Sequence, residues 1–102
     1  MGVLSWLGLG NKSEEIKKFM ANGAVIIDVR TVGEFKEGHI KNSKNIPLHE
    51  ISSKIEVIKK LDKPVIVCCR SGMRSGQANS ILKNNGIESI NGGGWSSLNS
   101  KI

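Results

Sequence analysis

The chain has 102 residues, of which 38% are hydrophobic and 24% are charged. This length supports one domain with a single core and excludes two, and the composition is that of a soluble globular protein whose core is aliphatic, because Tyr is absent and Trp and Phe are few. The formal net charge is +6, but the lysines are scattered without a basic run or interleaved aromatic residues, which argues against a nucleic-acid-binding protein.

The first dozen residues precede any regular pattern. Residues 1–10 contain an apolar patch that lacks the basic region of a signal peptide and is far too short to cross a bilayer. We expect residues 1–12 to form a flexible or weakly apolar segment, which frays or anchors on the domain or on a membrane surface. Residues 13–102 are expected to form the domain, with no transmembrane segment.

The domain begins with a helix pattern followed by a strand pattern. Ser13 can cap a helix that ends near Gly23, and acidic residues in its first turn favour it. Residues 24–29 are an apolar run interrupted only by Asp28, which predicts a strand buried on both faces of a parallel sheet. Asp28 then lies near the carboxyl end of that strand.

The middle of the chain holds two shorter patterns and one strong one. Residues 34–38 form a short segment to which we assign no element, and residues 43–46 are too brief to assign, although Pro47 marks their end. Isoleucines at helical spacing predict a second helix over residues 51–61. Residues 64–68 are the strongest strand signal, since Val65, Ile66 and Val67 are β-branched and are bounded by a proline. Cys69 stands where this strand stops.

The last third predicts a helix over residues 76–85, a strand over 87–90, a glycine-rich turn over 91–94 and a short final helix from Trp95. Alternating strands and helices predict an α/β domain of three layers, with a short, mainly parallel central sheet flanked by helices. Ligands of such sheets bind beyond the carboxyl ends of the strands, and Cys69 therefore lies where an active site is expected.

The loop after this strand carries residues that suit an anion site. It contains Cys69, Arg70, Ser71, Gly72, Met73, Arg74 and Ser75. Its backbone N–H groups and the positive end of the next helix form an anion cradle, in which a thiolate should have a lowered pKa. Gly72 lets the backbone curl, and Arg70 and Arg74 can bind an oxyanion such as thiosulfate. Ser71 and Ser75 could hydrogen-bond to the sulfur or cap the helix. An inert buried cysteine leaves these residues unexplained.

The two cysteines, Cys68 and Cys69, are adjacent. Neighbouring residues rarely meet disulfide geometry, so they do not form the disulfide framework of a secreted protein, and we expect a cytoplasmic setting. Side chains alternate along a strand, so Cys68 should point away from Cys69 as a small core residue. A role for Cys68 as resolving thiol would require the strand end to distort.

Several short motifs, taken in order, resemble the rhodanese family. They are Asp28-Val29-Arg30, Glu34-Phe35, Gly38-His39-Ile40, Asn45-Ile46-Pro47, the loop over residues 69–75, and Gly92-Gly93-Gly94-Trp95. The resemblance implies a monomeric sulfurtransferase of rhodanese type, in which Cys69 takes sulfane sulfur from thiosulfate or a persulfide donor. The resulting persulfide would pass its sulfur to cyanide, a thiol or a sulfur-accepting protein, without a cofactor or metal.

Two other functions remain open. A binding module could carry sulfur for a partner, or recognise one, with little turnover on thiosulfate. A small phosphatase or arsenate reductase of the same fold is the second alternative, but those enzymes have a loop one residue longer than the four residues between Cys69 and Arg74. A tighter ring of amides suits a sulfur atom better than a tetrahedral phosphate.

The resemblance also implies supporting residues around the loop. Asp28 and Arg30 would orient loops through hydrogen bonds and an ion pair with Glu34, and Trp95 would either wall the pocket or fill the core. Met73 could give the pocket mouth an apolar lip that favours a protein or thiol acceptor. Neither of the two histidines has a spacing with cysteines or carboxylates that suggests a metal site.

Overall fold

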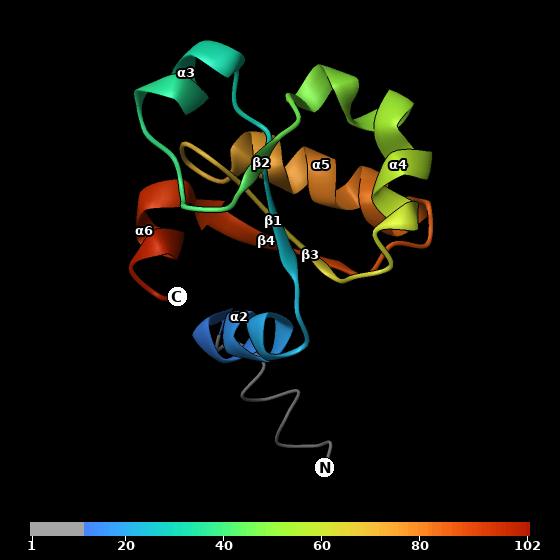
Figure 1. Cartoon of the computed structure of the whole chain (residues 1–102), viewed down its shortest axis with the longest axis horizontal. Coiled ribbons are helices and arrows are strands. Elements are labelled where there is room, and N and C mark those ends of the chain that lie inside the picture. Colours follow the sequence, from blue (N-terminus) through green and yellow to red (C-terminus); the bar gives the residue numbers. More distant parts are fainter. Residues whose placement is uncertain (1–11) are drawn as a thin grey trace.

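A computed structural model describes residues 12–102, which form a four-stranded parallel sheet with helices on both faces (Figure 1). The strand order is β2-β1-β3-β4. The strands are β1 (Val25–Asp28), β2 (Lys44–Asn45), β3 (Val65–Cys69) and β4 (Ser89–Gly94). The helices are α2 (Lys12–Ala21), α3 (Val32–Glu37), α4 (Ile55–Lys60), α5 (Met73–Asn84) and α6 (Trp95–Asn99), with a 3₁₀ segment η2 (Leu48–Lys54) before α4. The predicted α/β fold class is confirmed.

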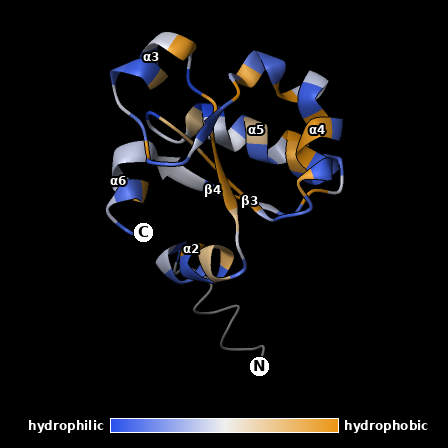
Figure 2. Ribbon diagram, viewed as in Figure 1, coloured by the Kyte–Doolittle hydropathy of each residue, from blue (hydrophilic) through white to orange (hydrophobic). Residues whose placement is uncertain are grey.

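The sheet separates two apolar clusters, because successive side chains of a strand point to opposite faces. One cluster joins β1 and β3 to η2, α4 and α5, and it includes Val67 and Cys69. The other joins β1, β3 and β4 to α2 and α6, and it includes Ile66 and Cys68. Figure 2 shows the hydrophobic colour concentrated along the central strands, as expected for strands buried on both faces. The domain therefore has the three layers predicted from the sequence.

The structure adds a helix that the sequence analysis did not predict. Residues 32–37 form α3, which begins with a capping box: the Thr31 hydroxyl accepts the Glu34 N–H, and the Glu34 carboxylate accepts the Thr31 N–H. A Thr followed three residues later by Glu is the known sequence signature of such a helix start. The helix matters for function because it brings Glu34 to the cysteine loop.

Other element boundaries differ from the predictions. Helix α2 begins at Lys12, so Ser13 lies inside its first turn instead of capping it, and residues 1–11 of the predicted N-terminal segment lie outside the described residues. The region from 48 to 60 starts as 3₁₀ and continues as α-helix. Helix α5 starts at Met73, three positions before the predicted start. Residues 91–94, predicted as a turn, belong to β4.

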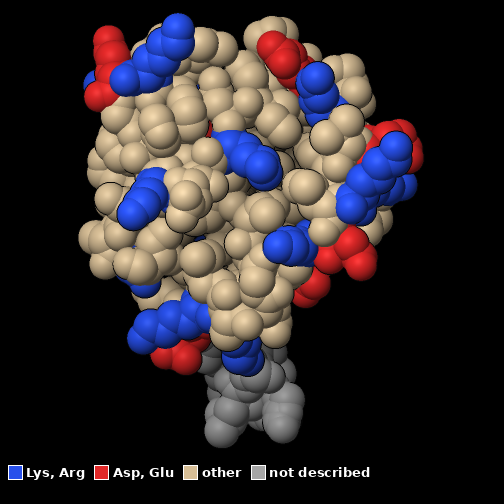
Figure 3. Space-filling model, viewed as in Figure 1, with Lys and Arg blue, Asp and Glu red and all other residues tan. Residues whose placement is uncertain are grey.

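Figure 3 shows basic side chains scattered over one face of the domain, with acidic side chains mostly near its edges and uncharged surface between them. This distribution agrees with a solvated surface and gives that face no single basic patch of nucleic-acid type. Among residues 12–102, no helix has the length and apolar character needed to cross a bilayer.

Candidate active site

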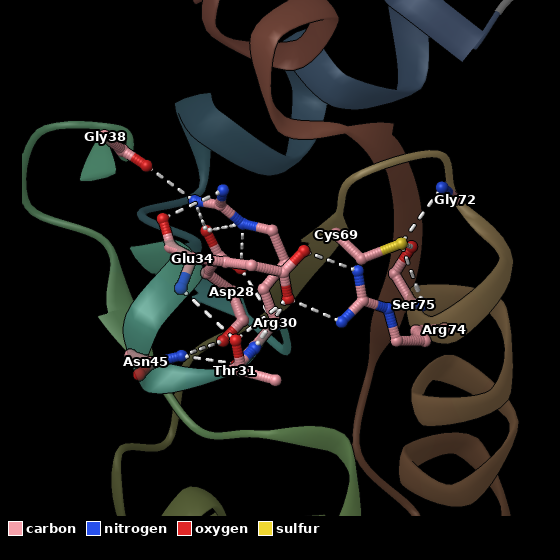
Figure 4. A network of polar contacts seen from close by, with 10 residues as sticks. All are labelled: Asp28, Arg30, Thr31, Glu34, Gly38, Asn45, Cys69, Gly72, Arg74 and Ser75. Carbon is pink, nitrogen blue, oxygen red and sulfur yellow. Dashed lines mark hydrogen bonds and ion pairs between the residues drawn. The ribbon is translucent and has the colours of Figure 1, made fainter. Parts of the chain in front are cut away.

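Cys69 is the last residue of β3, and its sulfur lies inside the loop that leads into α5 (Figure 4). The side chain is 1% exposed. The Gly72 amide donates to Sγ at 3.0 Å, the Ser75 amide lies at 3.4 Å and the Ser75 hydroxyl at 3.3 Å. Gly72 adopts φ +101°, a left-handed conformation that suits glycine and turns its N–H toward the sulfur. The predicted cradle of amides at a helix start is therefore present around Cys69.

The surroundings hold the pKa of Cys69 below its ordinary value. Burial is the largest single effect and favours the neutral thiol, but it is outweighed by hydrogen bonds from the Ser75 side chain and from the amides of Ser75, Gly72 and Ser71. Donors aimed at a sulfur stabilise its anion. This arrangement favours a thiolate that can attack an electrophile.

Cys68 has the opposite environment on the other face of β3. It is fully buried in the cluster beneath α2 and α6, and burial raises the pKa of its thiol to about 12, with the nearby Asp28 carboxylate adding to the effect. The opposite orientation of the two cysteines matches the prediction. Because Cys68 lies on the opposite face of the sheet from Cys69, it is a residue of the apolar core.

A buried ion pair fixes the chain just after β1. The Arg30 guanidinium donates to both Asp28 oxygens, with the shortest contact at 2.7 Å, and both side chains are at most 5% exposed. Arg30 also donates to the carbonyls of Gly38 at 2.7 Å and Glu34 at 3.3 Å, which ties both ends of α3 to the sheet. The Trp95 ring lies under the guanidinium, 4.7 Å from ring centroid to Cζ. These contacts give Asp28 and Arg30 the loop-orienting geometry that the sequence analysis predicted.

Glu34 pairs with a different arginine from the one expected. Its carboxylate accepts two hydrogen bonds from Arg74, at 2.8 and 3.0 Å, in a bidentate pair, whereas Arg30 reaches only its backbone carbonyl. The Arg74 hydrogen bonds, helped by the Thr31 amide, lower the pKa of Glu34 to about 2. Figure 4 shows the carboxylate between α3 and the start of α5. Arg74 therefore connects two elements and is already engaged by an anion of the protein itself.

Arg70 differs from Arg74 in its exposure to solvent. It is exposed and lines a cleft of about 310 Å³. The other lining residues are Arg30, Glu34, Glu37, Gly38 and Trp95. Trp95 thus forms part of the cleft wall and also packs on the cluster beneath α6, so both roles considered for it are filled. Met73 is 77% exposed and Ser71 is also exposed, which places both at the outer surface of the loop.

Two polar residues of the site were given no role by the sequence analysis. Asn45 donates to the carbonyls of Asp28 and Arg30, both at 3.0 Å, and so closes the turn after β1. Asn91 bonds to Gly72 and Ser75 of the cysteine loop. The sequence contained one signal for Asn91, which is its position just before three glycines. Because residues 91–94 were predicted to form a turn, Asn91 was not placed in the sheet.

The glycines after Asn91 allow β4 to approach the loop. A Cβ on Gly94 would lie 2.7 Å from the Arg70 carbonyl oxygen, so no larger residue fits without movement of the backbone. The pairing of β4 with β3 also shifts between Val67 and Cys68, which indicates a bulge at this point. The strand therefore supports the loop by direct backbone contact.

Neither histidine is part of this site. His39 Nδ1 lies 2.7 Å from the Phe35 carbonyl oxygen, and His49 is exposed next to Glu50. Within residues 12–102, the structure brings together no group of three side chains from His, Cys, Asp or Glu that could hold a metal ion.

Comparisons with known proteins point to one family. The model of the family described as "Rhodanese-like domain" matches residues 12–101. The chain is 42% identical over 67 residues to the "Uncharacterized protein YqhL" of Bacillus subtilis, a match covering 66% of this chain and 52% of that protein. It is 31% identical over 77 residues to the "Thiosulfate sulfurtransferase GlpE" of Pseudomonas aeruginosa, covering 76% of this chain and 69% of that one.

A solved structure points to the same family. The fold is similar to the structure described as "rhodanese with anions from E. coli", with a TM-score of 0.66 and 33% identity, over 72% of this chain and 89% of the other. The chain spans about half the length of the B. subtilis relative.

Proposed function

The chain belongs to the rhodanese-like domain family, and on that premise we propose that it is a sulfurtransferase in which Cys69 carries sulfane sulfur from thiosulfate or a persulfide to a thiophilic acceptor. The observation that carries the proposal is the set of donors around Sγ, which suits a sulfur anion at the end of a strand. Relatives named thiosulfate sulfurtransferase support the choice of donor.

In the first step, the Cys69 thiolate attacks the outer sulfur of thiosulfate. A bond forms between the two sulfurs, the bond to the sulfite sulfur breaks, and sulfite leaves with the electron pair. The product is a persulfide on Cys69 whose terminal sulfur is anionic. The amides of Gly72 and Ser75 donate to the cysteine sulfur before the step and hold it in place for the attack.

In the second step, an acceptor such as cyanide or a thiolate attacks the terminal sulfur of the persulfide. The sulfur–sulfur bond breaks and its electron pair returns to Cys69, which is again a thiolate. Donors that stabilise the thiolate also make it a better leaving group here. One residue therefore serves as nucleophile in the first half and as leaving group in the second.

We assign recruitment of the donor anion to Arg70. Its guanidinium is exposed in the cleft beside the loop, whereas the guanidinium of Arg74 is held by Glu34. Arg74 then supports the loop instead of binding the donor directly. The exposed Met73 offers an apolar contact for a thiol or protein acceptor. Arg30 and Trp95 line this cleft, and Asp28 holds Arg30 in place.

A persulfide carrier with little turnover on thiosulfate is the second candidate function, favoured by the burial of Sγ and by the exposed Met73 at the loop. Fast sulfur uptake from a protein persulfide, together with slow uptake from thiosulfate, would favour the carrier.

The test is intact mass spectrometry after incubation with thiosulfate, comparing the unmodified chain with Cys69→Ser and Cys68→Ser. We expect the chain and Cys68→Ser to gain the mass of one sulfur atom and Cys69→Ser to gain nothing. A gain that persists in Cys69→Ser would remove Cys69 as the sulfur carrier. Hydrolysis of an aryl phosphate that disappears in Cys69→Ser would support a phosphatase instead.

A further inference from the structure

Asn91 is linked to the cysteine loop by its whole side-chain amide. Its Nδ2 donates to the Gly72 carbonyl at 3.0 Å, and its Oδ1 accepts the Gly93 N–H at 2.9 Å. The Ser75 hydroxyl lies 2.7 Å from the same Oδ1. Since the amides of Gly72 and Ser75 both donate to the Cys69 sulfur, Asn91 contacts two of the residues that supply donors to it.

The orientation of this amide is fixed by its backbone partners. A carbonyl such as that of Gly72 can only accept, and an N–H such as that of Gly93 can only donate. A flipped amide would set like against like at both places, so Oδ1 faces Ser75. Because a carbonyl oxygen has no hydrogen, the Ser75 hydroxyl must be the donor in that bond.

The Ser75 hydroxyl has a single hydrogen and two neighbours that could take it. Asn91 Oδ1 lies at 2.7 Å and the Cys69 sulfur at 3.3 Å. With the hydrogen on Asn91, the hydroxyl presents a lone pair to the sulfur and can accept a hydrogen bond from the neutral thiol. Donation to the thiolate requires the hydroxyl to turn away from Asn91.

We propose that Asn91 is a positioning residue that acts through Ser75: it competes with the Cys69 sulfur for the hydroxyl hydrogen and so weakens the bond from Ser75 to the sulfur, which keeps the thiolate nucleophilic. The inference rests on the proposed role of Cys69. A thiolate loses nucleophilicity as its donors become stronger, and Cys69 must both attack and leave. Asn91 therefore sets a compromise between the amount of thiolate and the reactivity of each thiolate.

Loss of the Asn91 bond to Gly72 should disturb the loop little. The Gly72 carbonyl also accepts the Gly76 N–H at 3.0 Å, as the first backbone bond of α5. Gly72 therefore remains anchored when Asn91 is shortened. The main effect of such a change reaches the sulfur through Ser75.

Charged groups near Cys69 have to be considered before a pH profile is assigned to it. The titratable and charged groups are Cys68 on the same strand, Asp28 at the end of β1 and Arg30 after it, Glu34 on α3, Arg70 on the loop and Arg74 on α5. Burial raises the pKa of Cys68 to about 12, and the hydrogen bonds from Arg74 lower that of Glu34 to about 2. Both lie far from the range in which a reactive thiol titrates, and Cys68 can be replaced by Ala in every variant.

The experiment measures the rate of Cys69 alkylation by iodoacetamide against pH, in a Cys68→Ala background. Asn91→Ala should lower the Cys69 pKa by about half a unit to one unit, because the hydroxyl becomes free to donate to the thiolate. The rate at the alkaline plateau should fall about two- to threefold, since the thiolate is less nucleophilic. In a Ser75→Ala background, Asn91→Ala should leave the pKa unchanged.

A matched control comes from a second Ser–Asn bond between the same two elements. The Ser89 hydroxyl of β4 donates to Asn79 of α5 at 2.6 Å, away from the sulfur. Asn79→Ala also removes one hydrogen bond between α5 and β4, and it should move neither the pKa nor the plateau. Circular dichroism would check that each variant is folded.

Three results would overturn the inference: an unchanged or raised pKa in Asn91→Ala, an equal shift of the pKa with and without Ser75, or an equal shift in Asn79→Ala. Should Asn91→Ala not fold, Ser75→Ala alone decides. Removal of a hydroxyl that is committed to Asn91 should leave the Cys69 pKa nearly unchanged or slightly lowered, whereas removal of one that donates to the sulfur should raise that pKa by about one unit or more. Alkylation needs no sulfur donor, so a chain that shows this pattern without sulfur transfer would retain the role of Asn91 and lose the proposed function.

Discussion

Cys68 and Cys69 are neighbours in the chain and are 0% and 1% exposed, yet the fold moves their pKa values in opposite directions. Burial acts on both and favours the neutral thiol. On the face of Cys68 the Asp28 carboxylate adds to this effect of burial, and the opposing charge of Arg30 is too weak to outweigh the two. On the face of Cys69, the loop and the start of α5 supply donors. The alternation of a strand thus separates a thiol with a raised pKa from one with a lowered pKa, and hydrogen-bond donors decide the difference.

The largest effect on this contrast is expected from a substitution that moves the loop and leaves both cysteines in place. Gly94→Ala places a Cβ 2.7 Å from the Arg70 carbonyl oxygen, so the loop must shift. Its N–H donors then no longer point at the Cys69 sulfur. We expect sulfur transfer from thiosulfate to fall about 10- to 100-fold, because a displacement of about 1 Å at a reacting group has effects of this size. Steady-state kinetics would measure the fall.

Gly33→Ala is the control for that change, because a Cβ there meets nothing within 4 Å. It should leave the activity unchanged and the fold intact. A folded Gly94→Ala chain with full activity would show that the placement of the loop donors does not distinguish the two cysteines.

A second test concerns Cys68 and the pH dependence of stability. The folded-state pKa of Cys68, about 12, lies above the ordinary thiol value of 9.0, so at alkaline pH the unfolded chain releases this proton first. The stabilisation is complete below about pH 9 and is lost as the pH rises toward the folded value, by about 2 kcal/mol between pH 9 and 11. Cys68→Ala lacks this loss. Urea unfolding at both pH values should give a shallower decline for Cys68→Ala, and equal declines would contradict the contrast in environment.

Most of the fold could be predicted because it depends on periodicity. The apolar runs of β1 and β3 and the helical spacing of isoleucines are local patterns, and they placed Cys69 at the carboxyl end of the sheet. Helix α3 was missed although its capping box is visible as Thr31 and Glu34. Strand β4 was cut short because glycines indicate turns by themselves, whereas here they permit close approach to the loop.

The site could be predicted only as far as the chain is contiguous. Residues 69–75 form their own cradle, so the sequence was sufficient for the loop. The partner of Glu34 was not predictable in this way, since 40 positions separate it from Arg74, and only the packing of α3 beside α5 brings them together. Asn91 likewise reaches Ser75 from another strand, 16 positions away.

The smallest expected effect concerns the charge of Glu34 beside the Cys69 loop. In Glu34→Gln, the amide oxygen can still accept the Thr31 N–H, so α3 keeps its cap, but Arg74 loses its anionic partner. A freed guanidinium near Cys69 should attract thiosulfate, and a partly exposed ion pair is worth less than about 1 kcal/mol, so the KM for thiosulfate should fall about two- to fivefold with a smaller change in kcat. Glu37→Gln is the matched control, since Glu37 lines the same cleft and its loss changes the net charge equally. An equal fall of KM in both variants would assign the effect to overall charge, and a rise in Glu34→Gln would mean that Arg74 needs its partner to keep the loop in place.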